Sequence, residues 1–286
     1  MNNQGISLGL QAGVLLEKYG FHFSHSLGQN FLLDESFVRR LAACAAIVPG
    51  ERVLEIGPGA GVMTRCLLEE GARVTAVELD QSLRPVLDEM LAGQEGARVV
   101  YADALKLDPG ELFGGEPYRV VANLPYYITS DMILHLLRAK NKPSSITALV
   151  QKEAAERMDA AMGGKNWCAL SATVRYFGSC EALMDVPPEC FTPRPHVQSV
   201  FLRIRLYGQK PVQAKNEDRL LALIRAAFFM RRKTLANNLC ASFGMSRERA
   251  LSLLEACGLD PKVRGEAVPL EGLCALSDRM GREEGE

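Results

Sequence analysis

The chain has 286 residues, 33 Lys and Arg against 34 Asp and Glu, a formal net charge of −1 and 48% hydrophobic residues. An ordinary apolar fraction with almost no net charge excludes a wholly disordered chain. No run of 18 or more apolar residues occurs, which excludes a membrane-spanning helix. Residues 1–4 carry no charged segment ahead of an apolar stretch, so we expect no secretory signal.

The first half of the chain alternates between short apolar runs and helical patterns. Two helices are expected at 8–19 and 34–48, the second beginning after Asp34 and stopping at Pro49. Strands are then predicted at 52–56, 73–78, 98–102, 118–122 and 145–151, with helices at 61–70, 81–91 and 129–139. This alternation is typical of an α/β fold in which a doubly wound parallel sheet has helices on both faces.

The pattern changes beyond residue 152. Helices are predicted at 152–162 and 168–177, followed by strands at 179–186 and 197–206 that would close the sheet as an antiparallel pair. From residue 209 only helical patterns remain, at 217–229, 232–242, 246–257 and 268–280. We therefore expect an N-terminal helical extension over 1–20, an α/β domain over 21–208 and a small all-helical domain over 209–286.

The spacing of the cysteines and histidines indicates whether the chain could hold a zinc site or a disulfide framework. The eight cysteines include no CxxC pair, and the four histidines do not cluster with them. This spacing argues against a zinc site and against a disulfide framework, and it favours a reducing, cytoplasmic location. We expect no metal.

A glycine-rich loop, residues 57–61 (GPGAG), follows the first strand of the sheet. Gly57 and Gly59 would let the backbone approach a ligand closely. The spacing is GxGxG, so the GxGxxG fingerprint of dinucleotide-binding proteins is not matched. Glu55 adds a negative charge, and Pro58 has no N–H to donate, which suits a neutral or cationic ligand better than a pyrophosphate. Taken alone, the loop can also be a plain strand-to-helix turn.

Acidic residues end successive strands. Glu78 closes the second strand, where a carboxylate can accept hydrogen bonds from two ribose hydroxyls, and Asp103 follows the third, where it can accept one from an adenine amine. Either acid alone can be an exposed cap residue. Together with Glu55 they indicate a nucleoside ligand with little phosphate. S-adenosylmethionine fits this description, and NAD fits it less well.

The fourth strand ends in Asn123, Leu124, Pro125 and Tyr126. This can be an ordinary turn. As a functional element, the Asn123 oxygen and the Leu124 carbonyl would each accept one hydrogen of an adenine N6 amine and aim its lone pair at a methyl donor. Pro125 would stiffen the turn, and Tyr126 would offer a face for the base.

The Asn-Leu-Pro-Tyr sequence resembles the motif of N6-adenine methyltransferases. With residues 28–32 (GQNFL) it resembles the ribosomal RNA adenine dimethyltransferase family, over about residues 21–280. Further matching stretches are 53–59 (VLEIGPG), 103–105 (DAL), 150–153 (VQKE), 186–188 (VPP), 191–197 (FTPRPHV) and 227–239 (AFFMRRKTLANNL).

This resemblance implies a class I methyltransferase sheet with a Rossmann-like arrangement, S-adenosylmethionine as cofactor, and dimethylation of two adjacent adenosines in the 3′-terminal hairpin of 16S ribosomal RNA. The predicted catalytic residues are Asn123, Leu124, Pro125, Tyr126 and Phe191, the last as an aromatic covering the target base or else as a core residue. The predicted cofactor contacts are Gln29, Asn30, Leu32, Glu55, Gly57, Gly59, Glu78, Asp103 and Asn123.

Basic residues are concentrated in one part of the chain. Residues 194–233 contain ten Lys and Arg but only two acids, so this stretch is about +8 in a chain of net charge −1. Such asymmetry is typical of a phosphate-binding surface, and a solvated helical face is the alternative. The predicted RNA contacts are Arg194, Arg231, Arg232 and Lys233. Arg203 and Arg205 alternate with apolar residues on a strand, so we expect both to face water.

Several functions remain open at this point. The first is a monomeric enzyme acting on 16S ribosomal RNA within the small subunit or its precursor, away from membranes. A resistance-type dimethyltransferase of 23S ribosomal RNA shares the same sheet and motif logic. An RNA-binding assembly factor with secondary methyltransferase activity is a third possibility. An NAD-dependent oxidoreductase is disfavoured because GxGxxG is missing.

Overall fold

A computed structural model describes residues 6–24 and 27–283. Residues 1–4, on which the expectation about a secretory signal rests, lie outside this range. The chain divides into two compact units, the first made of residues 1–155 and 180–206 and the second of residues 156–179 and 207–286. Among the described residues, no helix combines the length and apolarity needed to cross a bilayer.

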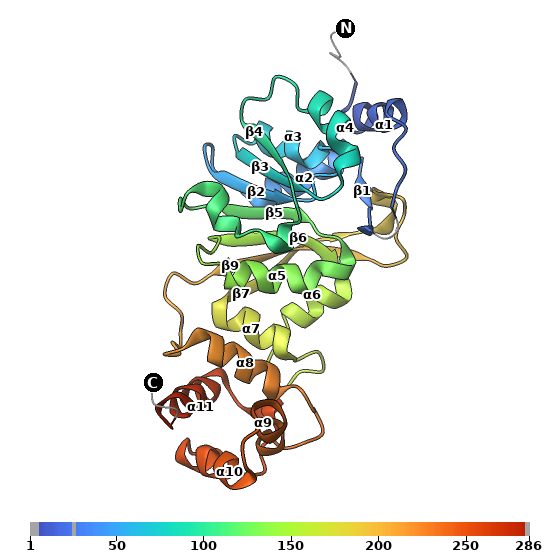
Figure 1. The fold of residues 1–286 in the computed structure, drawn as a ribbon. Coiled ribbons are helices and arrows are strands. Elements are labelled where there is room, and N and C mark those ends of the chain that lie inside the picture. The colour runs from blue at the N-terminus through green and yellow to red at the C-terminus, as the bar shows by residue number, and fades with distance from the viewer. Residues whose placement is uncertain (1–5, 25–26, 284–286) are drawn as a thin grey trace. The chain divides into compact units, whose positions relative to one another are not determined.

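The first unit is built on a seven-stranded sheet (Figure 1) with strand order β4-β3-β2-β5-β6-β9-β7. Its strands are β2 (Arg52–Ile56), β3 (Arg73–Glu78), β4 (Ala97–Tyr101), β5 (Arg119–Asn123), β6 (Ser145–Gln151), β7 (Gly178–Val186) and β9 (Ser199–Leu206). The first five run parallel to one another, and β9 pairs antiparallel with β6. The predicted doubly wound α/β sheet is confirmed.

Helices cover both faces of this sheet. They are α1 (Leu8–Lys18), α2 (Glu35–Ala45), α3 (Val62–Glu69), α4 (Arg84–Met90) and α5 (Thr129–Arg138), with α6 (Lys152–Met158) following β6. Val53, Val74 and Val121 share one buried core with α1 to α4. Because side chains alternate along a strand, their neighbours Leu54 and Val120 point to the other face, where α5 lies (Figure 1).

One predicted helix ends earlier than expected. The Asp34 carboxylate accepts a hydrogen bond from the Phe37 amide and caps the start of α2, as predicted. The helix stops at Ala45 rather than near Pro49, because Ala46 adopts the left-handed conformation with φ 51°. A left-handed residue ends a helix without any proline or glycine, so the stop signal at Pro49 was misleading here.

A second, two-stranded sheet was not predicted. It joins β1 (Phe31–Leu32) to β8 (Phe191–Thr192) in antiparallel register, with Leu32 opposite Phe191. Strands of two residues carry no periodic signal, so only long-range pairing defines them. This small sheet ties the segment after α1 to the proline-rich stretch ahead of β9.

The expectation that Arg203 faces water is wrong. Arg203 is buried, and its guanidinium donates to the Cys44 carbonyl and lies 3.4 Å from Glu181. The strand β9 lies between β6 and β7 rather than at an edge, so both of its faces can be covered. Arg205, two residues further on, is exposed as expected. Arg203 is therefore unavailable to any phosphate-binding surface.

The second unit is helical. It contains α7 (Ala169–Phe177), α8 (Glu217–Ala227), α9 (Leu235–Phe243), α10 (Arg247–Ala256) and α11 (Leu270–Glu283). Asn216, Thr234 and Ser246 cap the starts of α8, α9 and α10 with side-chain hydrogen bonds. The buried faces of these helices form an apolar core that includes Leu223, Leu239, Leu253 and Leu276.

Candidate functional site

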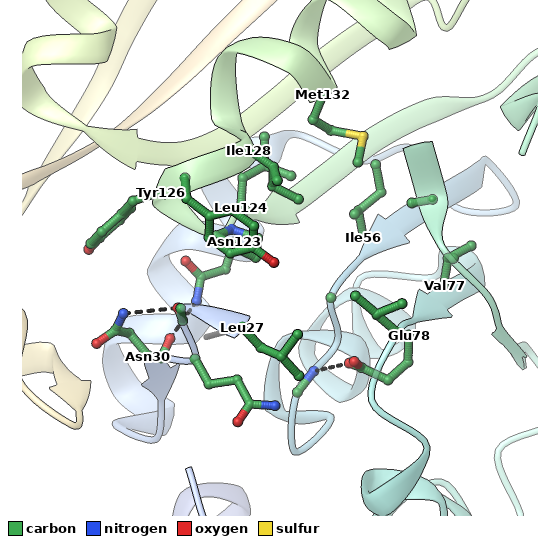
Figure 2. A pocket seen from close by; sticks show the side chains of 18 of the residues that line it. Leu27, Asn30, Ile56, Val77, Glu78, Asn123, Leu124, Tyr126, Ile128 and Met132 are labelled. Atoms are coloured by element: carbon green, nitrogen blue, oxygen red, sulfur yellow. Dashed lines mark hydrogen bonds between the residues drawn. The ribbon is translucent and has the colours of Figure 1, made fainter. Parts of the chain in front are cut away.

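The main pocket lies at the carboxyl ends of β2, β3, β4 and β5 and holds about 770 Å³ of empty space, part of it open to solvent (Figure 2). These strands flank the point at which the strand order reverses, between β2 and β5. Open α/β sheets bind ligands at such a reversal point. The volume is in the range of small-molecule sites.

The glycine loop needs its glycines. Gly57, Gly59 and Gly61 have φ values of 70°, 56° and 82°, a region that other residues rarely adopt. A Cβ on Gly59 would also lie 3.0 Å from the Phe31 ring. The loop therefore passes tightly between β2 and α3 and lines the pocket with backbone atoms.

Glu78 ends β3 at the pocket wall and is only 6% exposed. One carboxylate oxygen accepts a hydrogen bond from the Asp80 amide at 2.8 Å, and the other accepts one from the Gly59 amide at 3.3 Å (Figure 2). Burial raises the pKa of Glu78, and these backbone donors oppose that rise. The carboxylate is thus held in place between the glycine loop and the pocket.

Glu55 lines a smaller adjoining cavity of about 340 Å³ together with Leu32, Gly57 and Asn123. It is 2% exposed, and its Oε2 has no hydrogen-bond partner among the described residues. Burial raises the pKa of Glu55 to about 8, the Thr64 hydroxyl opposes the rise, and Glu78 adds to it. The Glu55 carboxyl is therefore largely protonated at neutral pH in the protein without ligand.

This burial makes stability depend on pH. Between about pH 4.5 and 8, folded chains hold a proton on Glu55 that unfolded chains release, so the free energy of unfolding falls as pH rises. The full slope is about 1.4 kcal/mol per pH unit. The Glu55→Gln variant is neutral throughout. We expect its stability relative to the wild type to increase by about 2 kcal/mol from pH 5.5 to 7.5 in urea unfolding. A difference that stays constant with pH would contradict this, and exposed Glu70→Gln is the control.

Asp103 and Gln29 also reach the pocket. The Asp103 carboxylate accepts a hydrogen bond from the Leu105 amide at 3.1 Å and lies 3.2 Å from the Lys106 ammonium. The Gln29 side chain donates to Asp80 at 2.7 Å, so it ties the segment ahead of β1 to the end of β3. Both residues therefore line the pocket, and their contact with a cofactor stays a prediction.

The orientation of Asn123 is the most informative feature of the site. Its amide nitrogen donates to the Asn30 carbonyl at 2.9 Å, and the Asn30 amide in turn donates to the Gly28 carbonyl at 3.1 Å (Figure 2). This contact fixes the orientation of the Asn123 amide. Its oxygen, which is the acceptor of the group, is therefore turned away from the Asn30 carbonyl and can accept a hydrogen bond from a ligand.

The turn after Asn123 is held by further contacts. The Pro125 carbonyl accepts hydrogen bonds from the Ile128 amide and the Thr129 hydroxyl, both at 3.2 Å. The Tyr126 hydroxyl lies 2.8 Å from the Ser199 hydroxyl, and burial raises the pKa of Tyr126. These contacts hold the Pro125 carbonyl and the Tyr126 ring, which lines the pocket.

The structure brings together most of the predicted site. The main pocket is lined by Gln29, Asn30, Gly57, Gly59, Glu78, Asp103, Asn123, Leu124, Pro125 and Tyr126. Leu32 and Glu55 line the smaller cavity. Phe191 lines neither, since it is 4% exposed and belongs to the core of the first unit. Arg194 pairs with Glu189 on the surface of the same unit.

Sequence reasoning missed the apolar lining of the pocket. Leu79 follows Glu78 and is 50% exposed, and Ala104 follows Asp103; both line the pocket, as does Tyr127. The available signal for Leu79 and Ala104 was their position directly after Glu78, which ends β3, and Asp103, which follows β4. No cluster of three or more metal-ligating side chains occurs within the described ranges.

Comparison with known proteins identifies the family of this chain. The family model for ribosomal RNA adenine dimethylase matches residues 20–278, which is most of the chain. The chain belongs to the ribosomal RNA adenine dimethylase family. It is 41% identical to "Ribosomal RNA small subunit methyltransferase A" of Lachnoclostridium phytofermentans over 271 residues, covering 92% of this chain and 93% of the relative.

Solved structures of similar proteins agree with this membership. The crystal structure of the 23S rRNA methyltransferase ErmE matches with a TM-score of 0.64 and 29% identity, covering 88% of this chain and all of that one. A dimethyladenosine transferase from Plasmodium falciparum matches with a TM-score of 0.71 and 24% identity, covering 87% and 96%. The latter likeness supports the fold shared by the family.

Proposed function

We propose that this family member transfers methyl groups from S-adenosylmethionine to N6 of two adjacent adenosines in the 3′-terminal hairpin of 16S ribosomal RNA. The observation that carries the proposal is the orientation of the Asn123 amide, which the hydrogen bond from its nitrogen to the Asn30 carbonyl fixes so that its oxygen can accept a hydrogen bond from the substrate. The carboxyl-end pocket and the buried Glu78 beside it suit a nucleoside cofactor.

The residues of the pocket fit S-adenosylmethionine. Glu78 would accept hydrogen bonds from the ribose hydroxyls, and Asp103 would accept one from the adenine amine. Leu79 would pack against the adenine ring. Gly57 and Gly59 would allow close approach of the backbone, with Gln29, Asn30, Leu32 and Glu55 completing the surroundings. The cofactor supplies a methyl group already activated by its sulfonium, so the reaction requires no metal.

The turn at residues 123–126 would then prepare the target amine. The Asn123 oxygen and the Leu124 carbonyl would accept the two N6 hydrogens and direct the nitrogen lone pair towards the methyl group. Each new N–C bond would replace the C–S bond of the methyl donor, which becomes a neutral thioether, and the methylated nitrogen would release one proton to water. Tyr126 would stack on the base, since its ring is held in the pocket wall by the Ser199 contact.

RNA binding requires surfaces outside the pocket. We assign methyl transfer to residues 21–208 and RNA binding to residues 209–286, with Arg231, Arg232 and Lys233 contacting phosphates and Arg194 contributing from the first part. The side chain of Phe191 lies in the core rather than in the pocket lining. Its predicted role of covering the target base stays a prediction.

Sequence identity favours 16S ribosomal RNA over 23S ribosomal RNA as the substrate. Identity is 41% to the small-subunit relative but 29% to the 23S enzyme, over a similar share of the chain. A role in small-subunit assembly beyond methylation is compatible with the same fold.

The test is transfer of labelled methyl groups to unmethylated small-subunit particles and, in parallel, to protein-free 23S ribosomal RNA. We expect incorporation into the particles only. Incorporation into 23S RNA alone would move the chain to the resistance type, and incorporation into neither would contradict the proposed reaction.

A further inference from the structure

The turn between α8 and α9 presents an aromatic side chain to solvent. Phe229 is 67% exposed, more than any other large hydrophobic residue in the described ranges. Its neighbour Phe228 does the opposite, with its ring 6.0 Å from that of Trp167 in an edge-to-face arrangement. Two consecutive phenylalanines thus have separate roles, one anchoring the turn and the other projecting from it.

The turn is held in one conformation. Asn238 is fully buried on α9, where its side-chain oxygen accepts a hydrogen bond from the Met230 amide at 3.2 Å and its nitrogen donates to the Ala227 carbonyl at 3.0 Å. The Phe229 amide donates to the Ala226 carbonyl at 3.1 Å. The exposure of Phe229 therefore belongs to a braced turn rather than to a frayed helix end.

The stretch of sequence around Phe229 is basic. Residues 219–247 contain six Lys and Arg and no acid. Arg231 lies 3.4 Å from Glu266, whereas Arg232 and Lys233 are exposed and have no acidic partner within the described residues. One aromatic ring and two uncompensated cations thus lie within five residues on the same turn.

A single exposed hydrophobic side chain is ordinary, so the proposal depends on the two unneutralised cations that lie on the same turn. Basic side chains that contact phosphates, with an aromatic ring on which a base stacks, are the combination by which proteins hold single-stranded nucleic acid. An apolar protein partner would have to strip water from Arg232 and Lys233 without replacing their counter-charges. Single-stranded RNA offers a base to the Phe229 ring and phosphates to Arg232 and Lys233.

We propose that Phe229 stacks on an unpaired base of the ribosomal RNA substrate while Arg232 and Lys233 contact the adjacent phosphates. This inference rests on the proposed function and deepens it, because it assigns a contact to a nucleobase as well as to the backbone. Stacking on a phenylalanine tolerates any base, so this contact adds affinity for unpaired RNA without reading its sequence.

The test measures the affinity of the full chain for protein-free, unmethylated 16S ribosomal RNA and for small-subunit particles at several salt concentrations. Loss of one stacked base is worth about tenfold in affinity, so Phe229→Ala is expected to weaken binding to both by about that factor. Phe229→Leu keeps an apolar side chain and should weaken binding similarly, whereas Phe229→Trp should retain it.

Salt dependence separates stacking from charge. Phe229→Ala should leave the slope of log affinity against log salt concentration unchanged, whereas Arg232→Gln should make it shallower by about one phosphate contact. Unchanged affinity of Phe229→Ala, full affinity of Phe229→Leu, or a loss seen with particles but not with protein-free RNA would overturn the proposal. Wild-type methyl transfer is assayed in the same preparations, so its absence would count against the proposed function alone.

Discussion

Replacing Asn123 with alanine is expected to lower the rate of methyl transfer at least about 100-fold, the usual cost of removing a group that stabilises charge developing in the transition state. The reason is geometric. The Asn123 side-chain nitrogen donates to the Asn30 carbonyl at 2.9 Å, which fixes the amide in the orientation that our proposal requires for its oxygen to accept a hydrogen bond from the substrate amine. The measurement is single-turnover transfer of labelled methyl groups to unmethylated small-subunit particles.

Two controls make this result specific. Asn166 is a surface asparagine whose side chain donates a hydrogen bond to Glu156. The Asn166→Ala variant should therefore transfer methyl groups at the wild-type rate. Thermal unfolding of Asn123→Ala should show a folded protein. If a folded Asn123→Ala variant retained the wild-type rate, the Asn123 side chain would not be needed for the reaction. The backbone carbonyl of Leu124 would then be the only acceptor left for the amine.

Replacing Glu78 with alanine is expected to weaken binding of S-adenosylmethionine by about 100-fold. Hydrogen bonds to an ionised group contribute about 1.5–3 kcal/mol each, and about 3 kcal/mol corresponds to slightly more than 100-fold. Glu78 also accepts the Gly59 amide, so its loss frees the glycine loop as well. Titration calorimetry of the cofactor into the full chain measures the change.

The matched control for this variant is Glu70→Ala, an exposed glutamate at the end of α3, which should bind the cofactor with wild-type affinity. Affinity of Glu78→Ala within about twofold of the wild type would show that the ribose is bound elsewhere. Because that outcome concerns the cofactor alone, it leaves the assignment of Asn123 to the target amine intact.

The sheet and the pocket could be predicted from sequence because their signals are local. Apolar runs marked the strands, and the residues directly after each run, such as Glu78 and Asn123, had to meet at one edge of a parallel sheet. The orientation of the Asn123 amide could not be predicted in this way, since it depends on the carbonyl of Asn30, 93 residues away.

Other features were beyond sequence reasoning for the same physical reason. The pairing of Leu32 with Phe191 joins strands too short to have a period. Arg203 looked like a water-facing residue because alternation predicts faces but not whether a second layer covers them. Residues 156–179 group with the C-terminal helices although the sequence continues directly from the sheet, because packing, not chain order, defines a compact unit.

The most direct test of the central claim is the identity and position of the modified nucleosides. Unmethylated small-subunit particles are incubated with the enzyme and S-adenosylmethionine, and the 16S RNA is digested and analysed by mass spectrometry. We predict N6,N6-dimethyladenosine at two adjacent positions in the 3′-terminal hairpin. Methylation at another atom or at another site, with those two adenosines unmodified, would contradict the account.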